Sequence, residues 1–258
     1  MLIAALAGGC AHSKKSARGV GAVEVYSVPQ APAFLNGPMA LLLTNLNGFR
    51  AHAVLESGVS AQGVVATEGE LMGRGGKLVF APGPSSATGK RSSPEGAAFI
   101  WDVTANRGFL LNDPMQAYAP ISINRQFTNV VTGSAMNGAA AERISGHPCQ
   151  LAQATVAASD GSITGFRLCR ATDLNGFPVR ITLASDGPPL TLTLSRIRLE
   201  TLPDDLFQPP KGFAKYDSAE GLINELAARQ NNFKRLPTYQ TQEVEPGSGT
   251  EGRLPTRP

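Results

Sequence analysis

The sequence predicts a mainly β (α+β) fold, in which a β-sheet is bracketed by two helices. Only 17% of the 258 residues are charged, and the 28 glycines and 19 prolines are turn-formers typical of a β-rich exported protein. Segments with a period of two, the repeat of a strand, fill the middle of the chain. Two segments with helical spacing flank them, and the length suffices for one large domain with a sizeable core.

The first helix is predicted over residues 37–46, where apolar residues recur at roughly helical spacing. Pro38 suits a first turn, and Asn47-Gly48 is a signal for the end of a helix. Residues 49–55 follow with Phe49 and three further apolar residues on one side, which is the period of a strand.

Further strands are predicted where period-two segments lie between Gly-Gly, Pro-Gly and Asn-Arg-Gly turns. In the last of them, residues 190–199, the apolar residues change phase, which predicts a β-bulge near Ser195-Arg196. These strands cover residues 64–72, 77–80, 98–103, 108–111, 149–156, 163–169, 177–183 and 190–199.

The second helix is predicted over residues 217–230, with Asp217 or Ser218 as its cap. Its apolar face consists of Leu222, Ile223 and Leu226.

The two ends of the chain differ from the middle. The segment Leu6 to Cys10 resembles a bacterial lipobox, in which cleavage precedes a cysteine that then carries a lipid, although Ala7 stands where Leu, Val or Ile is usual. An ordinary signal remnant with an incidental cysteine is the alternative. The predicted organisation is a signal and lipobox segment (1–10), a flexible spacer (11–33), one domain (34–235) and a disordered, Pro/Gly/Thr/Glu-rich tail (236–258).

A lipid on Cys10 predicts a protein of the bacterial cell envelope with a membrane anchor as its first partner. Ala11, rather than Asp, after the cysteine favours the outer membrane, facing the periplasm, by resemblance to proteobacterial sorting. No run of about 18 apolar residues is present, so no membrane-spanning helix is predicted.

Cys149 and Cys169 lie in two strands that are predicted to form a hairpin centred near Ser159-Asp160. Such a hairpin places the two cysteines almost opposite each other, at the Cα separation of about 4.5–5.5 Å that suits a disulfide. The three cysteines of the chain then divide into one acylated residue and one disulfide. Two buried free thiols are the alternative.

The sequence predicts no enzyme, no cofactor and no metal site. The strong motifs of hydrolases, zinc proteases, P-loops and dinucleotide-binding folds are missing, and the acidic residues lack the spacing of a calcium loop. His147 and Cys149 would form a catalytic dyad only if the thiol were free and ionised. A net charge of +3 without a basic block predicts no nucleic-acid partner.

Three later segments follow the first helix and its Phe-x-Ala strand in a characteristic order. They are Gly69 to Phe80, Phe99 to Asn112 and the Phe-x-x-Pro-x-Gly type segment Leu206 to Phe213. This order resembles the LolA/LolB-like lipoprotein-carrier superfamily, nearest to an uncharacterised bacterial lipoprotein branch. The resemblance implies a curved, incompletely closed antiparallel half-barrel, with an N-terminal and a C-terminal helix covering its concave face. It also implies a cavity for acylated ligands.

Two departures from the family concern its functional parts. Carrier members hold their lid with an Arg-Pro pair after the second strand, where this chain has Gly75-Gly76 with Arg74 one position early. A shift of one residue points Arg74 to the other face of the sheet unless a bulge corrects it. Receptor members present an exposed apolar loop; the candidate here is residues 112–118, although Met115 and Tyr118 are of types that more often pack.

Two functional hypotheses follow from a half-barrel whose concave face is apolar. In the first, an envelope lipoprotein binds or carries a lipid or acyl chain in a hydrophobic cavity without catalysis. In the second, the core is filled and a structural or adaptor lipoprotein binds an envelope protein partner. The residues predicted to line the cavity or fill the core are Leu42, Leu46, Phe49, Ala51, Leu71, Phe80, Phe99, Trp101, Leu192, Leu194, Leu222 and Leu226.

Overall fold

The computed structural model describes residues 37–60, 63–83, 96–122, 127–135, 142–184 and 190–235. The predicted lipobox with Cys10, the spacer, residues 34–36 and the tail from residue 236 lie outside the described residues.

Strands dominate the described chain, and two α-helices lie near its ends. The helical elements are η1 (Pro38–Ala40), α1 (Leu41–Thr44), η2 (Thr172–Leu174), η3 (Asp204–Phe207) and α2 (Ala219–Arg235). The strands are β1 (Phe49–Ser60), β2 (Gly63–Arg74), β3 (Lys77–Pro82), β4 (Ala97–Asp102), β5 (Arg107–Asn112), β6 (Ala117–Ile121), β7 (Phe127–Ala135), β8 (Glu142–Ile144), β9 (His147–Ala158), β10 (Ile163–Ala171), β11 (Phe177–Leu183), β12 (Leu190–Leu199) and β13 (Ala214–Lys215).

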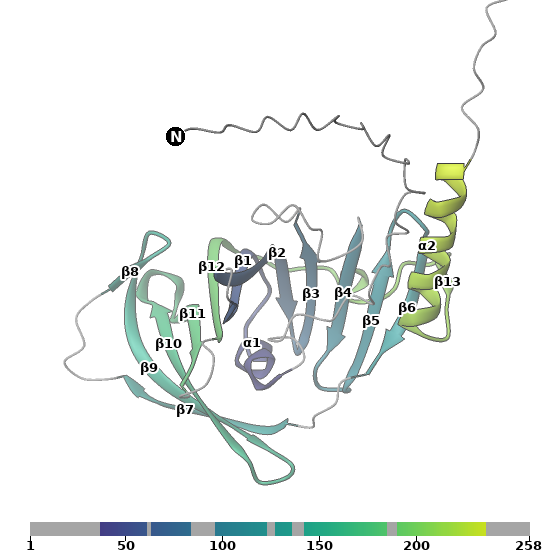
Figure 1. Cartoon of the computed structure of the whole chain (residues 1–258). Coiled ribbons are helices and arrows are strands. Elements are labelled where there is room, and N and C mark those ends of the chain that lie inside the picture. Colours follow the sequence, from purple (N-terminus) through teal and green to yellow (C-terminus); the bar gives the residue numbers. More distant parts are fainter. Residues whose placement is uncertain are drawn as a thin grey trace, which may run out of the picture.

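These strands form one sheet of thirteen strands, in the order β13-β6-β5-β4-β3-β2-β1-β12-β11-β10-β9-β7, with β8 paired to β9. All described pairs are antiparallel except β13 with β6. The sheet is strongly curved, and the two ends of its strand order, β13 and β7, do not pair with each other (Figure 1). The predicted curved, unclosed and mainly antiparallel sheet is therefore confirmed.

One edge of the sheet gathers several strand ends. Strands β1, β3, β5, β9 and β11 begin there, and β2, β4, β6, β10 and β12 end there, because each is antiparallel to its neighbour. The short helix α1 leads into this edge through residues 45–48. We call this edge the α1 rim.

The two faces of the sheet bury different clusters. The larger cluster contains the inward side chains of most strands together with side chains from η1, α1 and α2, and Figure 1 shows α1 inside the curve of the sheet. This is the concave face. On the convex face, a smaller cluster lies where η3 and the residues before it cover β3 and β4. That cluster consists of Met72, Val79, Ile100, Leu111, Leu202 and Phe207.

The β-bulge predicted near Ser195-Arg196 is confirmed. Arg50 pairs with Arg198 but His52 pairs with Ser195, so β12 contains one extra residue at this point. Arg196 has a left-handed backbone with φ 51°, a conformation that a bulge imposes on one of its residues. The bulge lets Leu192 and Leu194 remain on the concave face while the end of the strand changes phase.

Candidate functional site

The concave face is floored by aromatic rings that lie over glycines. Phe49 pairs with Gly73 across β1 and β2, and a Cβ added to Gly73 would lie 2.3 Å from a ring carbon of Phe49. A Cβ on Gly69 would lie 2.8 Å from the ring of Phe80. The two glycines of β2 therefore leave the room that the rings occupy, which makes this part of the face flat and apolar.

The inward residues predicted from the sequence are almost completely buried. Phe49, Leu71 and Phe80 are each 0% exposed, and the strand residues of the predicted set do not exceed 1%. On α2, the predicted Leu222 and Leu226 are buried at 0% and 7% exposure, together with Ile223. The remaining members of the buried strand set are Ala51, Phe99, Trp101, Leu192 and Leu194.

Against β2, β7 and β9 lies a seven-residue cover of this face, Pro38–Thr44, made of η1 and α1, which we call the plug. Met39, Ala40 and Leu43 are its buried residues, each 1% exposed. The amide of Gly76 donates a 3.0 Å hydrogen bond to the carbonyl of Thr44 at the end of the plug. Neither η1 nor α1 has a side-chain cap at its N-terminus.

The residues predicted on this helix, Leu42 and Leu46, pack against the concave cluster but are not its most buried members. Leu42 and Leu46 are only partly buried, whereas Leu43 is buried together with Met39 and Ala40. The helix begins as a 3-10 turn, with about three residues per turn, before it becomes α-helical. This change of period rotates the inward face by about one residue relative to a regular α-helix.

Trp101 combines deep burial with an unused polar group. Its side chain is 1% exposed in the concave cluster, and its indole Nε1 is buried without a hydrogen-bond partner among the described residues. The ring lies 6.5 Å from that of Phe99, and its cross-strand neighbours are Leu78 and Gly108. Neither of these neighbours has a polar side chain that could accept its proton.

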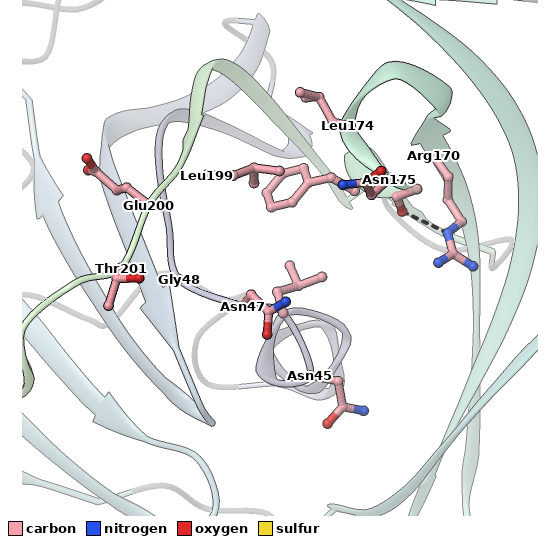
Figure 2. A pocket seen from close by; sticks show the side chains of 12 residues that line it. Asn45, Asn47, Gly48, Arg170, Leu174, Asn175, Leu199, Glu200 and Thr201 are labelled. Carbon is pink, nitrogen blue, oxygen red and sulfur yellow. Dashed lines mark hydrogen bonds between the residues drawn. The ribbon is translucent and has the colours of Figure 1, made fainter.

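A hollow of about 520 Å³ opens at the α1 rim, between the end of α1, the η2 turn and the end of β12 (Figure 2). Its apolar lining includes Phe177, which is buried and packs edge-on against Phe49 at 5.1 Å between ring centroids. Through Phe177 the hollow adjoins the aromatic floor of the concave face. Its lining consists of residues 45–48, Arg170, residues 174–177 and residues 199–201.

A second hollow of about 470 Å³ adjoins the first and shares Arg170, Asn175 and Gly176 with it. Arg170 is oriented by the turn, because its Nε donates a 2.9 Å hydrogen bond to the carbonyl of Gly176, drawn as a dashed line in Figure 2. The acidic residue at this site, Glu200, is already paired with Arg50 at 3.1 Å. The shared wall of the two hollows is thus polar and carries the positive charge of Arg170.

Of the residues predicted to line a cavity, Leu46 lies in the wall of the first hollow, and sequence reasoning missed the rest of the lining of both hollows. The local signal was the Asn175-Gly176 pair, which is typical of a tight turn and has φ values of 53° and 78°. That signal predicts a turn, but it does not predict that the turn will lie beside the end of α1.

The predicted disulfide is not formed: Cys149 and Cys169 are both free and buried. The predicted register is wrong by two residues, because Cys149 pairs with Ala171 and Cys169 pairs with Leu151. The hairpin turn is centred on Asp160, with the amide of Ala158 bonded to the carbonyl of Ser162, whereas direct pairing of the two cysteines requires a centre at Ser159. A centre displaced by one residue moves every partner by two. The cysteines are therefore diagonal neighbours on one face of β9 and β10.

The two thiols lack the chemistry of a nucleophile. Burial raises the pKa of the Cys169 thiol to about 11, with the carboxylate of Glu142 adding to the effect. Burial also raises the pKa of Cys149, so both remain protonated at neutral pH. His147 is directed elsewhere, with its Nδ1 2.9 Å from a carboxylate oxygen of Asp173. The geometry therefore argues against a Cys149 and His147 dyad.

Arg74 lies on the convex face, as its one-residue offset predicts. No bulge interrupts the pairing of β2 with β3 near it, and its guanidinium donates to the carbonyl of Leu202 and lies 3.6 Å from Asp204. Lys77 lies 3.8 Å from the same carboxylate. Arg74 thus fastens the segment before η3 and does not reach the plug.

The segment Asn112 to Tyr118 is not an exposed apolar loop. Residues 113–116 form the tight turn between β5 and β6, in which the buried Asn112 side chain accepts a 3.0 Å hydrogen bond from the amide of Met115. Met115 packs against the concave cluster and Tyr118 against the convex one. The candidate for the exposed apolar loop of receptor members is therefore corrected: this segment is a packed turn.

Within the described part of the chain, no helix has the length and apolar character needed to cross a membrane. Among the same residues, no group of three or more His, Cys, Asp or Glu side chains is placed to hold a metal ion.

Comparison with known proteins finds similar structures but no related sequences. No protein-family model matches the chain, and no curated protein matches it. Among solved structures, a LolA superfamily protein from Nitrosomonas europaea aligns with a TM-score of 0.41 and 12% identity, covering 69% of this chain and 98% of that one.

Two further structures show the range of these matches. The lipoprotein LppX of Mycobacterium tuberculosis aligns with a TM-score of 0.34 and 17% identity, covering 67% of this chain and 99% of that one. An outer membrane lipoprotein-sorting protein domain from Vibrio parahaemolyticus, described as putative, aligns with a TM-score of 0.36 and 12% identity, over 66% and 93% of the two chains. Likenesses at this level do not identify what this chain binds.

Proposed function

We propose that the chain is a non-enzymatic lipoprotein of the bacterial envelope that binds a lipid or acyl chain against its concave face. In this proposal a lipid on Cys10 anchors it to the outer membrane, and the domain faces the periplasm. The observation that carries the proposal is the plug, a short helical cover over a large apolar face, with an open hollow at its end. The ligand enters at the α1 rim and takes the place of the plug.

The energetics of exchange favour an acyl chain over the plug. Fully burying Met39 or Leu43 contributes about 2 kcal/mol each. Burying a dozen methylene groups contributes about 10 kcal/mol, at about 0.8 kcal/mol per group. Releasing the plug also returns backbone entropy of about 1 kcal/mol or more per residue. The burial available to a long acyl chain therefore exceeds the burial of the two plug side chains, before the cost of immobilising the ligand is subtracted.

The second candidate is a structural or adaptor lipoprotein that binds an envelope protein partner. It is favoured by the near-complete burial of the concave face by the chain's own residues, which includes Phe49, Leu71 and Phe80 at 0% exposure. In that case the plug is a permanent part of the core and no lipid replaces it.

Native mass spectrometry separates the two candidates. The full chain with Cys10→Ser, purified without detergent, is measured intact and then extracted with solvent. An added mass that extracts as lipid, or saturable uptake of a fluorescent fatty acid that palmitate displaces, supports ligand binding. A clean ligand-free mass without uptake contradicts it and favours the adaptor. Anchoring is tested separately, by radiolabelled palmitate incorporation into the unaltered chain and its loss in the Cys10→Ser variant.

A further inference from the structure

We infer that Trp101 is a polar anchor inside the apolar face, and that its indole N–H binds the carbonyl oxygen of an ester-linked acyl chain. The inference rests on the proposed function and names the chemical class of the ligand. It makes Trp101 a specificity-determining residue that distinguishes an acyl ester from a plain hydrocarbon.

The inference starts from an unpaired donor. The Trp101 side chain is 1% exposed, and Nε1 is the one buried side-chain nitrogen or oxygen that lacks a hydrogen-bond partner in the described part of the chain. Buried polar groups are almost always paired, because an unpaired one loses its bond to water and gains nothing in return. Phenylalanine would supply an apolar ring at this position without that loss. A donor here is therefore explained by an acceptor that arrives with a ligand.

The position of Trp101 suits a ligand that replaces the plug. Trp101 pairs with Leu78, one residue away from the start of β3 at the α1 rim. The amide of Val103 donates a 2.9 Å hydrogen bond to the carbonyl of Gly76, whose own amide holds Thr44 at the end of the plug. The end of β4 is thus connected to the end of the plug by two successive hydrogen bonds. In the inferred binding mode, a ligand that replaces the plug has its polar end at the rim and its first carbonyl beside Trp101.

The chemistry of the site selects an ester carbonyl among the possible acceptors. An alkane has no acceptor. An ionised carboxylate would be buried in an apolar cluster without a positive partner, which is strongly unfavourable. A hydroxyl would accept the indole proton but would bring its own unpaired donor. An ester carbonyl accepts one hydrogen bond and brings no donor and no charge.

The test compares methyl palmitate with octadecane, two ligands of similar length that differ in the ester group. Because Trp101 is the sole tryptophan of the chain, its indole N–H gives a single signal in the nitrogen-15 NMR spectrum of the Cys10→Ser protein. We expect methyl palmitate to bind about tenfold more tightly than octadecane, equivalent to about 1.4 kcal/mol. We also expect methyl palmitate, and not octadecane, to shift the indole signal downfield.

Two variants complete the test. Trp101→Phe removes the donor and is expected to abolish the preference for the ester. Phe99→Leu, on the same strand and face, removes ring contacts without removing a donor, so it is expected to weaken both ligands and keep the preference.

Equal binding of ester and alkane with an unmoved indole signal overturns the inference, while the proposed function stands. This is also the result expected if a buried water satisfies the indole. Failure of both ligands to bind contradicts the proposed function and, with it, the inference. The indole signal of the unmutated side chain decides the matter even if Trp101→Phe does not fold.

Discussion

Leu43→Asp tests whether the plug can leave the concave face without unfolding the sheet. Leu43 is 1% exposed, and an aspartate there must either be buried in the apolar cluster or bring the plug into water. Burying the carboxylate costs several kcal/mol, whereas releasing the plug forfeits the burial of Met39 and Leu43, about 2 kcal/mol each, and recovers backbone entropy. The lower-energy response is therefore release of the plug.

The assay is urea denaturation followed by the fluorescence of Trp101. If the plug is released, the free energy of unfolding falls by no more than about 2–3 kcal/mol, because the recovered entropy offsets much of the lost burial. The urea m-value also falls, since the native variant already exposes part of the concave face. The tryptophan emission shifts to the red before unfolding, and the dye 1-anilinonaphthalene-8-sulfonate binds.

Leu42→Asp is the matched control, because Leu42 is on the same helix but only partly buried. We expect it to cost about 1 kcal/mol and to leave the m-value unchanged. A loss of 4 kcal/mol or more in Leu43→Asp with an unchanged m-value would refute the reasoning, because it would show that the plug unfolds only with the rest of the core.

Three further predictions concern stability and the faces of the sheet. Burial raises the pKa of Cys169 from its ordinary 9.0 to about 11, so the unfolded chain loses this proton first. Stability to urea is therefore complete below pH 9 and falls between pH 9 and 11. Cys169→Ala is expected to reduce this fall, and the remainder comes from Cys149, whose pKa burial also raises. Gly73→Ala forces the Phe49 ring aside and is expected to lower the free energy of unfolding in urea by about 1–3 kcal/mol. In the control Gly165→Ala the added carbon lies 3.7 Å from its nearest neighbour, so the free energy of unfolding is expected to change by no more than about 0.5 kcal/mol. Equal losses in the two variants would contradict the packing of Phe49 on Gly73. Arg74→Ala is expected to speed hydrogen exchange around η3 and to leave acyl-ligand affinity unchanged, and a loss of affinity would mean that Arg74 controls the concave face.

The sequence was a good guide where periodicity and burial agree. The inward phase of β1, with Phe49 and Ala51, follows from alternation alone, and the two phases of β12 predict the bulge at Arg196. The convex position of Arg74 follows from the same alternation.

Features that depend on turn geometry or on distant contacts escaped prediction. Strand β6 contains Pro120, which argues against a central strand. The strand forms because Pro120 is exposed and lies beyond Ala117 and Tyr118, the residues of β6 that pair with β13. The β9–β10 turn is centred on Asp160 and not on Ser159, and this difference of one residue pairs Cys149 with Ala171, two residues beyond Cys169. The first hollow is lined by residues 45–48 at the end of α1 and by residues 174–177, which are about 130 residues apart in the sequence. Local sequence patterns carry no information on such a long-range contact.

Hydrogen exchange with and without methyl palmitate tests the central claim most directly, using the full chain with Cys10→Ser. The account predicts that the ligand accelerates exchange in the plug, above all at residues 40–44, and slows exchange in the strands of the concave face. It also predicts that Gly76 loses protection, because its hydrogen bond to Thr44 is broken. Binding with a plug that remains equally or better protected would contradict displacement, and no binding at all would contradict the ligand-binding account.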